Sequence, residues 1–114
     1  MTVIYHNPRC SKSRQTLALL EEHGINADIR LYLKEAPSIE EITTLLSQLD
    51  LPAVELMRTK EATYKELGLS AQSSDEERIQ AMHSHPILIE RPIVIHDNKA
   101  RLGRPPEQVL ELFK

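Results

Sequence analysis

A single cysteine, Cys10, is the side chain in this sequence best suited to covalent chemistry. It stands between a predicted strand over residues 2–6 and a predicted helix over residues 11–23. The free backbone N–H groups and the dipole at the start of a helix favour negative charge. Basic residues also lie within four positions of Cys10, and no acidic residue precedes Glu21. Because this setting favours thiolate over thiol, we predict a nucleophile rather than a buried, inert cysteine.

Two polar residues near Cys10 leave alternatives open. Ser13 occupies the position that a second cysteine would take in a Cys-x-x-Cys pair, so the chain cannot form an internal disulfide. An oxidised Cys10 must therefore be reduced by an external thiol through exchange. Ser13 itself is either a hydrogen-bond donor to the thiolate or an ordinary residue of the first helical turn. His6 either tunes Cys10 or ends the strand, and we favour tuning.

Three arginines further along the chain have the chemistry of an oxyanion site. Arg91 and Arg104 each precede a proline, which holds a residue extended and can aim its side chain. Arg58 lies in a Leu-Met-Arg-Thr-Lys segment. Guanidinium groups bind tetrahedral oxyanions through forked pairs of donors. Taken one at a time, each arginine is more simply interpreted as a solvated surface charge.

The distribution of charge predicts one anion pocket built from two distant segments. The net charge is +3 over residues 1–14 and +3 over residues 91–104, but −8 over residues 15–90. Two basic segments flanking an acidic one are what such a pocket would require. Chance clustering on solvated faces is the alternative.

The overall composition excludes several classes of function. The chain has 114 residues, 40% hydrophobic and 27% charged, which suits one ordinary globular core. A net charge of −3 and an aromatic content of 4% argue against nucleic-acid binding. The absence of a long apolar run argues against a membrane span. One cysteine and no signal segment predict a cytoplasmic protein. We also expect a monomer that binds no metal and no resident cofactor.

The first part of the chain has the pattern of a β-α-β unit followed by helices. After the strand over 2–6 and the helix over 11–23, Gly24 is a natural helix stop, and residues 26–33 alternate like a second strand. A helical insertion follows at about residues 38–84. Its two main helices are opened by capping-box pairs, Ser38 with Glu41 and Ser74 with Glu77.

The last part of the chain has the pattern of a β-β-α unit. Strands are predicted over residues 93–96 and 99–102, joined by a tight Asp-Asn turn. A terminal helix begins at the Pro105-Pro106 pair. We therefore predict an α/β, thioredoxin-like fold, with residues 1–114 forming a single domain interrupted by the helical insertion. The residues predicted to face inward from the terminal helix are Val109, Leu110 and Phe113.

The segment from Tyr5 to Arg14, Tyr-His-Asn-Pro-Arg-Cys-Ser-Lys-Ser-Arg, strongly resembles the active-site segment of the glutaredoxin-coupled arsenate reductases, the ArsC type. The likeness continues in order along the whole chain, and Pro92 matches a proline that is cis in thioredoxin-like proteins. Further matching segments are Tyr32-Leu33, Leu56-Met57-Arg58, Tyr64-Lys65-Glu66-Leu67-Gly68-Leu69, His85-Pro86-Ile87-Leu88-Ile89-Glu90-Arg91-Pro92-Ile93-Val94 and Arg101-Leu102-Gly103-Arg104-Pro105.

This resemblance implies an activity and a role for each candidate residue. Cys10 would attack arsenate and form a thiol–arsenate adduct. Glutathione would then attack the adduct, and glutaredoxin would remove the mixed disulfide after arsenite leaves. His6 would help to ionise the cysteine, and Ser13 would support the thiolate. The arginines that would hold the oxyanion and its reduced product are Arg58, Arg91 and Arg104.

Two other functions are compatible with such a fold. Regulators of the Spx type share it and bind RNA polymerase, but they commonly carry a Cys-x-x-Cys pair where this chain has Ser13. The second alternative is a thiol oxidoreductase acting on glutathione-linked substrates, in which the arginines would bind glutathione carboxylates. We favour the arsenate reductase over both.

Overall fold

The sheet and the two basic segments belong to the same compact unit. The computed structural model describes residues 2–114, and the chain divides into two units. The sheet unit comprises Met1–Glu35 and Arg91–Lys114, and the helical unit comprises Ala36–Glu90. The helical unit is thus inserted in the sequence of the sheet unit. That the whole chain acts as one domain stays a prediction.

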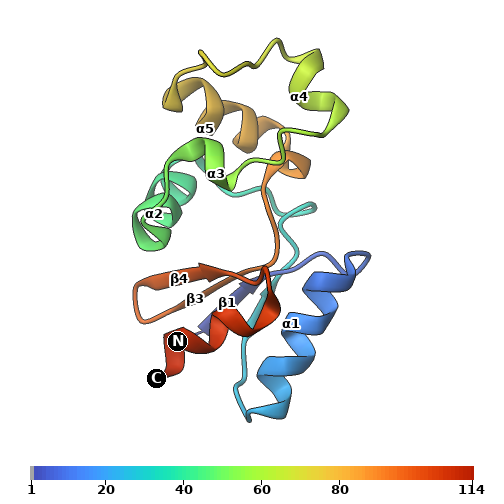
Figure 1. Cartoon of the computed structure of the whole chain (residues 1–114), viewed down its shortest axis with the longest axis vertical. Helices are drawn as coiled ribbons and strands as arrows, with labels where there is room; N and C mark the ends of the chain where they lie inside the picture. The colour runs from blue at the N-terminus through green and yellow to red at the C-terminus, as the bar shows by residue number, and fades with distance from the viewer. Residues whose placement is uncertain (1) are drawn as a thin grey trace. The chain divides into compact units, whose positions relative to one another are not determined.

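A four-stranded mixed sheet forms the sheet unit, with the strand order β2-β1-β3-β4 (Figure 1). β1 pairs in parallel with β2 and antiparallel with β3, and β3 pairs antiparallel with β4. The parallel pair requires a crossover, which helix α1 (Ser11–Glu22) supplies. This order confirms the predicted thioredoxin-like α/β fold. The strands are β1 (Thr2–Tyr5), β2 (Asp28–Arg30), β3 (Ile93–His96) and β4 (Lys99–Leu102).

Helix α1 and the C-terminal 3₁₀ helix η2 (Pro106–Phe113) pack on the sheet through one apolar cluster. Ile4 and Val94 are cross-strand partners, so their side chains share a face of the sheet. Leu20 and Val109 pack against them, and all four side chains are 0% exposed. Burying each such side chain contributes about 1.5–3 kcal/mol. This cluster fixes α1, and therefore the first turn of α1, relative to the strands.

The turn of the β3–β4 hairpin confirms the sequence prediction. Asp97 and Asn98 have φ values of 48° and 67°. Both angles are positive, as a two-residue type I′ turn requires, and Asp and Asn tolerate this conformation better than most residues.

The helical unit is built around helices opened by the two predicted capping boxes. The Ser38 hydroxyl accepts from the Glu41 N–H at 3.0 Å, and the Glu41 carboxylate accepts from the Ser38 N–H at 2.9 Å. The Ser74–Glu77 pair repeats this pattern. No helix among residues 2–114 is both long and apolar enough to cross a bilayer. The helices are α2 (Ile39–Leu49), α3 (Ala53–Leu56), α4 (Ala62–Glu66), α5 (Asp75–Ser84) and the 3₁₀ helix η1 (Pro86–Leu88).

The second predicted strand, over 26–33, is wrong in its extent. β2 covers only Asp28–Arg30, because turns in which Leu31 O accepts from the N–H groups of Lys34 and Glu35 at 2.9 Å close the strand early. β2 is also an edge strand that pairs only with β1. Ile29 is 52% exposed, so the alternation in this segment does not mark a buried face.

The predicted terminal helix exists, but it is a 3₁₀ helix rather than an α-helix. Its apolar residues Pro106, Val109 and Leu112 recur every three positions, which matches the three residues per turn of a 3₁₀ helix. Val109 is fully buried as predicted, whereas Leu110 and Phe113 are only half-buried.

Candidate functional site

Cys10 lies at the N-cap of α1, as predicted. Its backbone is extended, with φ −94° and ψ 123°, and its carbonyl accepts the first helical bond, from the Arg14 N–H at 3.0 Å. No acidic residue occupies the first turn. The residue is 8% exposed. The start of a helix has free N–H groups and a dipole that favour negative charge.

Arg104 brings a guanidinium to this sulfur from the other end of the chain. Its Nη2 lies 3.9 Å from Cys10 Sγ, and its Nε donates to the carbonyl oxygen of Arg91 at 2.8 Å. The Nε and Nη1 atoms of Arg91 are buried. The Arg91–Pro92 and Arg104–Pro105 bonds are both cis, and the first of these was expected. The sheet unit thus brings the side chains of Cys10 and Arg104 together, and Arg91 is joined to them through its backbone carbonyl.

Gly103 allows the segment that carries Arg104 to pass close to α1. Its N–H donates to Pro92 O at 2.9 Å. A Cβ on Gly103 would lie 2.6 Å from Thr16 Oγ1 and 2.7 Å from Pro92 Cγ. Sequence reasoning did not single out this residue. The available signal was a glycine directly before Arg104 in a segment already matched to the family.

Replacing Gly103 with alanine is expected to lower the free energy of unfolding by about 1–3 kcal/mol, the usual cost of overpacking. The new methyl group would have to push Thr16 or the Pro92 ring aside. Urea denaturation measures this cost. Because Thr16→Ala removes one of the two close contacts, the double variant should lose less stability than the sum of the single variants. Strict additivity would contradict the predicted contact.

His6 and Ser13 form a buried pair beside the Cys10 turn. His6 Nδ1 lies 2.7 Å from Ser13 Oγ, and the same hydroxyl oxygen accepts from the Asn7 N–H at 3.0 Å. Burial lowers the pKa of His6 from its ordinary value of 6.5, and the charge of Arg14 lowers it further. The lowered pKa favours the neutral form of the His6 ring, which contacts the Ser13 hydroxyl. The effect of either side chain on Cys10 stays a prediction.

The lowered pKa of His6 predicts a loss of stability in acid. The unfolded chain binds a proton on this imidazole near pH 6.5, whereas the folded chain binds it only at lower pH. The free energy of unfolding should therefore fall as the pH drops through 6.5. His6→Asn keeps a polar atom near the Nδ1 position and removes the titration, so its decline should be shallower. Urea denaturation on either side of pH 6.5 measures both, and equal slopes would contradict the prediction.

Arg58 belongs to the helical unit. Its Nη1 lies 2.8 Å from a Glu61 carboxylate oxygen, and its Nε lies 3.8 Å from Glu90. Its side chain is 28% exposed. The N–H of Arg58 donates to Leu88 O at 2.8 Å, which fixes the backbone here. The role of Arg58 in binding the oxyanion stays a prediction.

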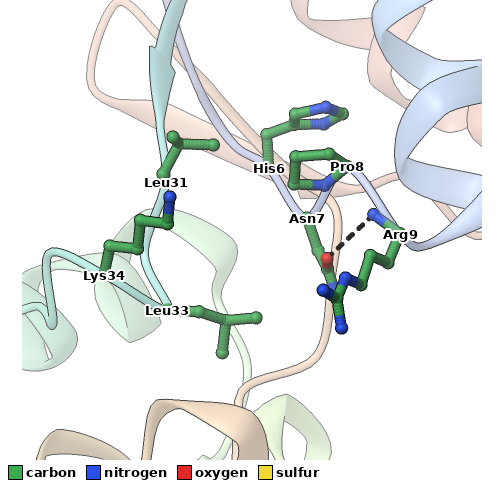
Figure 2. Close-up of a pocket in the computed structure, with 7 residues that line it drawn as sticks. All are labelled: His6, Asn7, Pro8, Arg9, Leu31, Leu33 and Lys34. Carbon is green, nitrogen blue, oxygen red and sulfur yellow. Dashed lines mark hydrogen bonds between the residues drawn. The ribbon is translucent and has the colours of Figure 1, made fainter.

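A pocket of about 330 Å³ opens beside the loop that leads to Cys10 (Figure 2). One wall is the loop after β1, and the other is the segment after β2. We call it the β1–β2 pocket. Its lining residues are His6, Asn7, Pro8, Arg9, Leu31, Leu33 and Lys34.

Metal ligands do not gather in the part of the chain that the structure describes. Among residues 2–114, no group of three or more His, Cys, Asp or Glu side chains could hold an ion. Two histidines lie close in sequence, in the segment His83-Ser84-His85. The Nδ1 atom of His83 lies 2.9 Å from the backbone oxygen of Pro37.

Known proteins resemble this chain along nearly its full length. The model of the ArsC family matches residues 5–112. An arsenate reductase of Haemophilus influenzae is 50% identical over 113 residues, which cover 97% of each chain. The uncharacterized protein YfgD of Escherichia coli is 55% identical over 111 residues, 96% of this chain and 93% of that protein.

Solved structures lead to the same group. The arsenate reductase from Vibrio cholerae is 57% identical, with a TM-score of 0.94 over 97% of this chain and 96% of its own. The family match, the Cys10 segment and the fold therefore agree. The chain belongs to the ArsC family.

Proposed function

We propose that this protein reduces arsenate to arsenite, with Cys10 as its one nucleophile and with glutathione and glutaredoxin as the source of electrons. One observation carries the proposal: the Nη2 of Arg104 lies 3.9 Å from Cys10 Sγ at a helix N-terminus. A nucleophilic sulfur and a guanidinium that can bind oxyanions therefore lie side by side. This arrangement suits attack on a tetrahedral oxyanion. The names of close relatives support arsenate as that oxyanion.

The first step would join sulfur to arsenic. The Cys10 thiolate attacks arsenate and forms an S–As bond, while one arsenate oxygen takes up protons and leaves as water. Arg104, held by the Arg91 carbonyl, balances the negative charge of the remaining oxygens. Arsenic is still As(V) in this adduct.

Reduction would follow at sulfur. A glutathione thiolate attacks Cys10 Sγ, so an S–S bond forms and the S–As bond breaks. The electron pair of the broken bond stays on arsenic, which leaves as arsenite, As(III). A glutaredoxin thiolate then attacks the glutathione sulfur of the mixed disulfide and releases the Cys10 thiolate. Because the chain has one cysteine, the second thiol must come from outside.

A coupled assay tests this proposal. NADPH consumption is followed with glutathione reductase, glutathione, glutaredoxin and arsenate, and each component is omitted in turn. We expect turnover that requires all of them. Phosphate and sulfate should inhibit competitively, because an arginine site selects by shape and charge, whereas only arsenic(V) is reduced by thiols. No turnover in the complete mixture would refute arsenate as the substrate.

A further inference from the structure

We propose that the β1–β2 pocket binds the thiol co-substrate, as an extended peptide with a carboxylate at each end, the chemistry of glutathione. This inference rests on the proposed function but concerns a different surface from Arg91 and Arg104. It assigns the step after the arsenate adduct to specific residues of this chain.

Charge is the first argument for a ligand with two carboxylates. Arg9 and Lys34 come from opposite walls of the β1–β2 pocket (Figure 2), and both are exposed. None of the residues that line the pocket is acidic. One tetrahedral anion would need donors that converge on a point. Two cations on facing walls instead suit a longer ligand with a negative group for each cation.

The apolar part of the lining matches the stem of such a peptide. Leu31, Leu33 and Pro8 line the pocket between the charged residues. Leu33 is 44% exposed although it is apolar, so a bound aliphatic chain would remove its surface from water. The volume of about 330 Å³ is at the lower end of the ~300–1,000 Å³ typical of small-molecule sites. A tripeptide is of suitable size for this space.

The pocket lies beside the turn that leads to Cys10. The wall residue Arg9 directly precedes Cys10, and the Cys10 N–H donates to Asn7 O at 3.0 Å. The Asn7 side chain also accepts from the Arg9 N–H at 3.0 Å (Figure 2). The wall is therefore a hydrogen-bonded turn that ends at the nucleophile. Arg104 reaches the same sulfur from the segment after β4, so oxyanion and thiol would approach from different elements.

A disulfide exchange that needs no arsenate tests this site. The Cys10 thiolate attacks oxidised glutathione, forms the mixed disulfide and releases one glutathione thiolate. Mass spectrometry gives the rate, and neutral hydroxyethyl disulfide is the comparison substrate. We expect Lys34→Ala to slow the exchange with oxidised glutathione by about two- to fivefold, the effect of one exposed ion pair. Its rate with hydroxyethyl disulfide should not change.

The matched control is Lys99→Ala, which removes one exposed positive charge from β4, outside the pocket. It should leave both rates unchanged. Equal slowing by Lys34→Ala and Lys99→Ala would overturn the proposal, because net charge alone would then explain the effect. If Lys34→Ala slowed exchange with both oxidised glutathione and hydroxyethyl disulfide, the proposal would also be overturned, because the substitution would then act on the Cys10 thiol itself.

The two proposals can fail separately. Selective exchange that depends on Lys34, without any arsenate turnover, would support the pocket and refute arsenate as the substrate. Arsenate turnover in which Lys34→Ala leaves the KM for glutathione unchanged would refute the pocket and leave the proposed function in place. If both hold, Lys34→Ala should raise the KM for glutathione and not the KM for arsenate.

Discussion

Replacing Cys10 with serine is expected to abolish arsenate-dependent turnover, with a loss of at least about a thousandfold. A serine hydroxyl fills similar space, but it is not ionised at neutral pH and forms no disulfide with glutathione. Both the attack on arsenic and the reduction at sulfur therefore fail. The coupled NADPH assay measures the loss, and mass spectrometry should find no glutathione adduct on the variant.

Ser11→Ala is the control for this prediction, since Ser11 is the next residue, exposed and in the first turn of α1. It should keep most of the activity. Unfolding by urea should show that the Cys10→Ser chain is as stable as the wild type. Substantial turnover by a stable Cys10→Ser protein would mean that Cys10 is not the nucleophile.

Replacing Arg104 with alanine is expected to lower kcat/KM for arsenate by about a hundredfold, the usual effect of removing one donor to a developing oxyanion. The change removes both the guanidinium beside Sγ and the bond to the Arg91 carbonyl. Arg104→Lys keeps one charge but cannot donate to both groups as a fork, so it should restore only part of the activity. Steady-state kinetics with varied arsenate measure both variants.

Arg101→Ala is the matched control for Arg104. Arg101 lies on β4, three residues earlier, and its guanidinium pairs with Glu111 at 3.5 Å. Its side chain is 39% exposed. Its replacement removes the same charge from the same segment and should change kcat/KM little. If Arg101→Ala and Arg104→Ala were equally impaired, the positive charge of the segment, and not the contact with Cys10, would explain the result.

Local features of the site could be predicted from the sequence, whereas distant contacts could not. The place of Cys10 at a helix N-terminus follows from a strand, an Asn-Pro break and a helix in succession, all within a short window. The capping boxes are local in the same way. The extent of β2 was not predictable from its alternation, because its edge position and the turns after Arg30 limit its length.

The pairing of Arg104 with Cys10 joins residues that are 94 positions apart. No periodicity connects such residues, and only the two basic segments and the family resemblance linked them beforehand. The hydrogen-bond partner of the Ser13 hydroxyl depends on the rotamer of this buried side chain, and the composition does not determine that rotamer. Lys34 was not singled out for the same reason, since its position across from Arg9 depends on the pairing of β1 with β2.

The separation of Cys10 from Arg104 has a consequence for the protein during its synthesis. At about 5–20 residues per second, some 5–20 s pass between addition of the cysteine and addition of the arginine. Throughout this interval the growing chain carries the sulfur without its guanidinium, and without β3, the strand next to β1. The proposed oxyanion site is therefore complete only when the last part of the chain has been added and has folded.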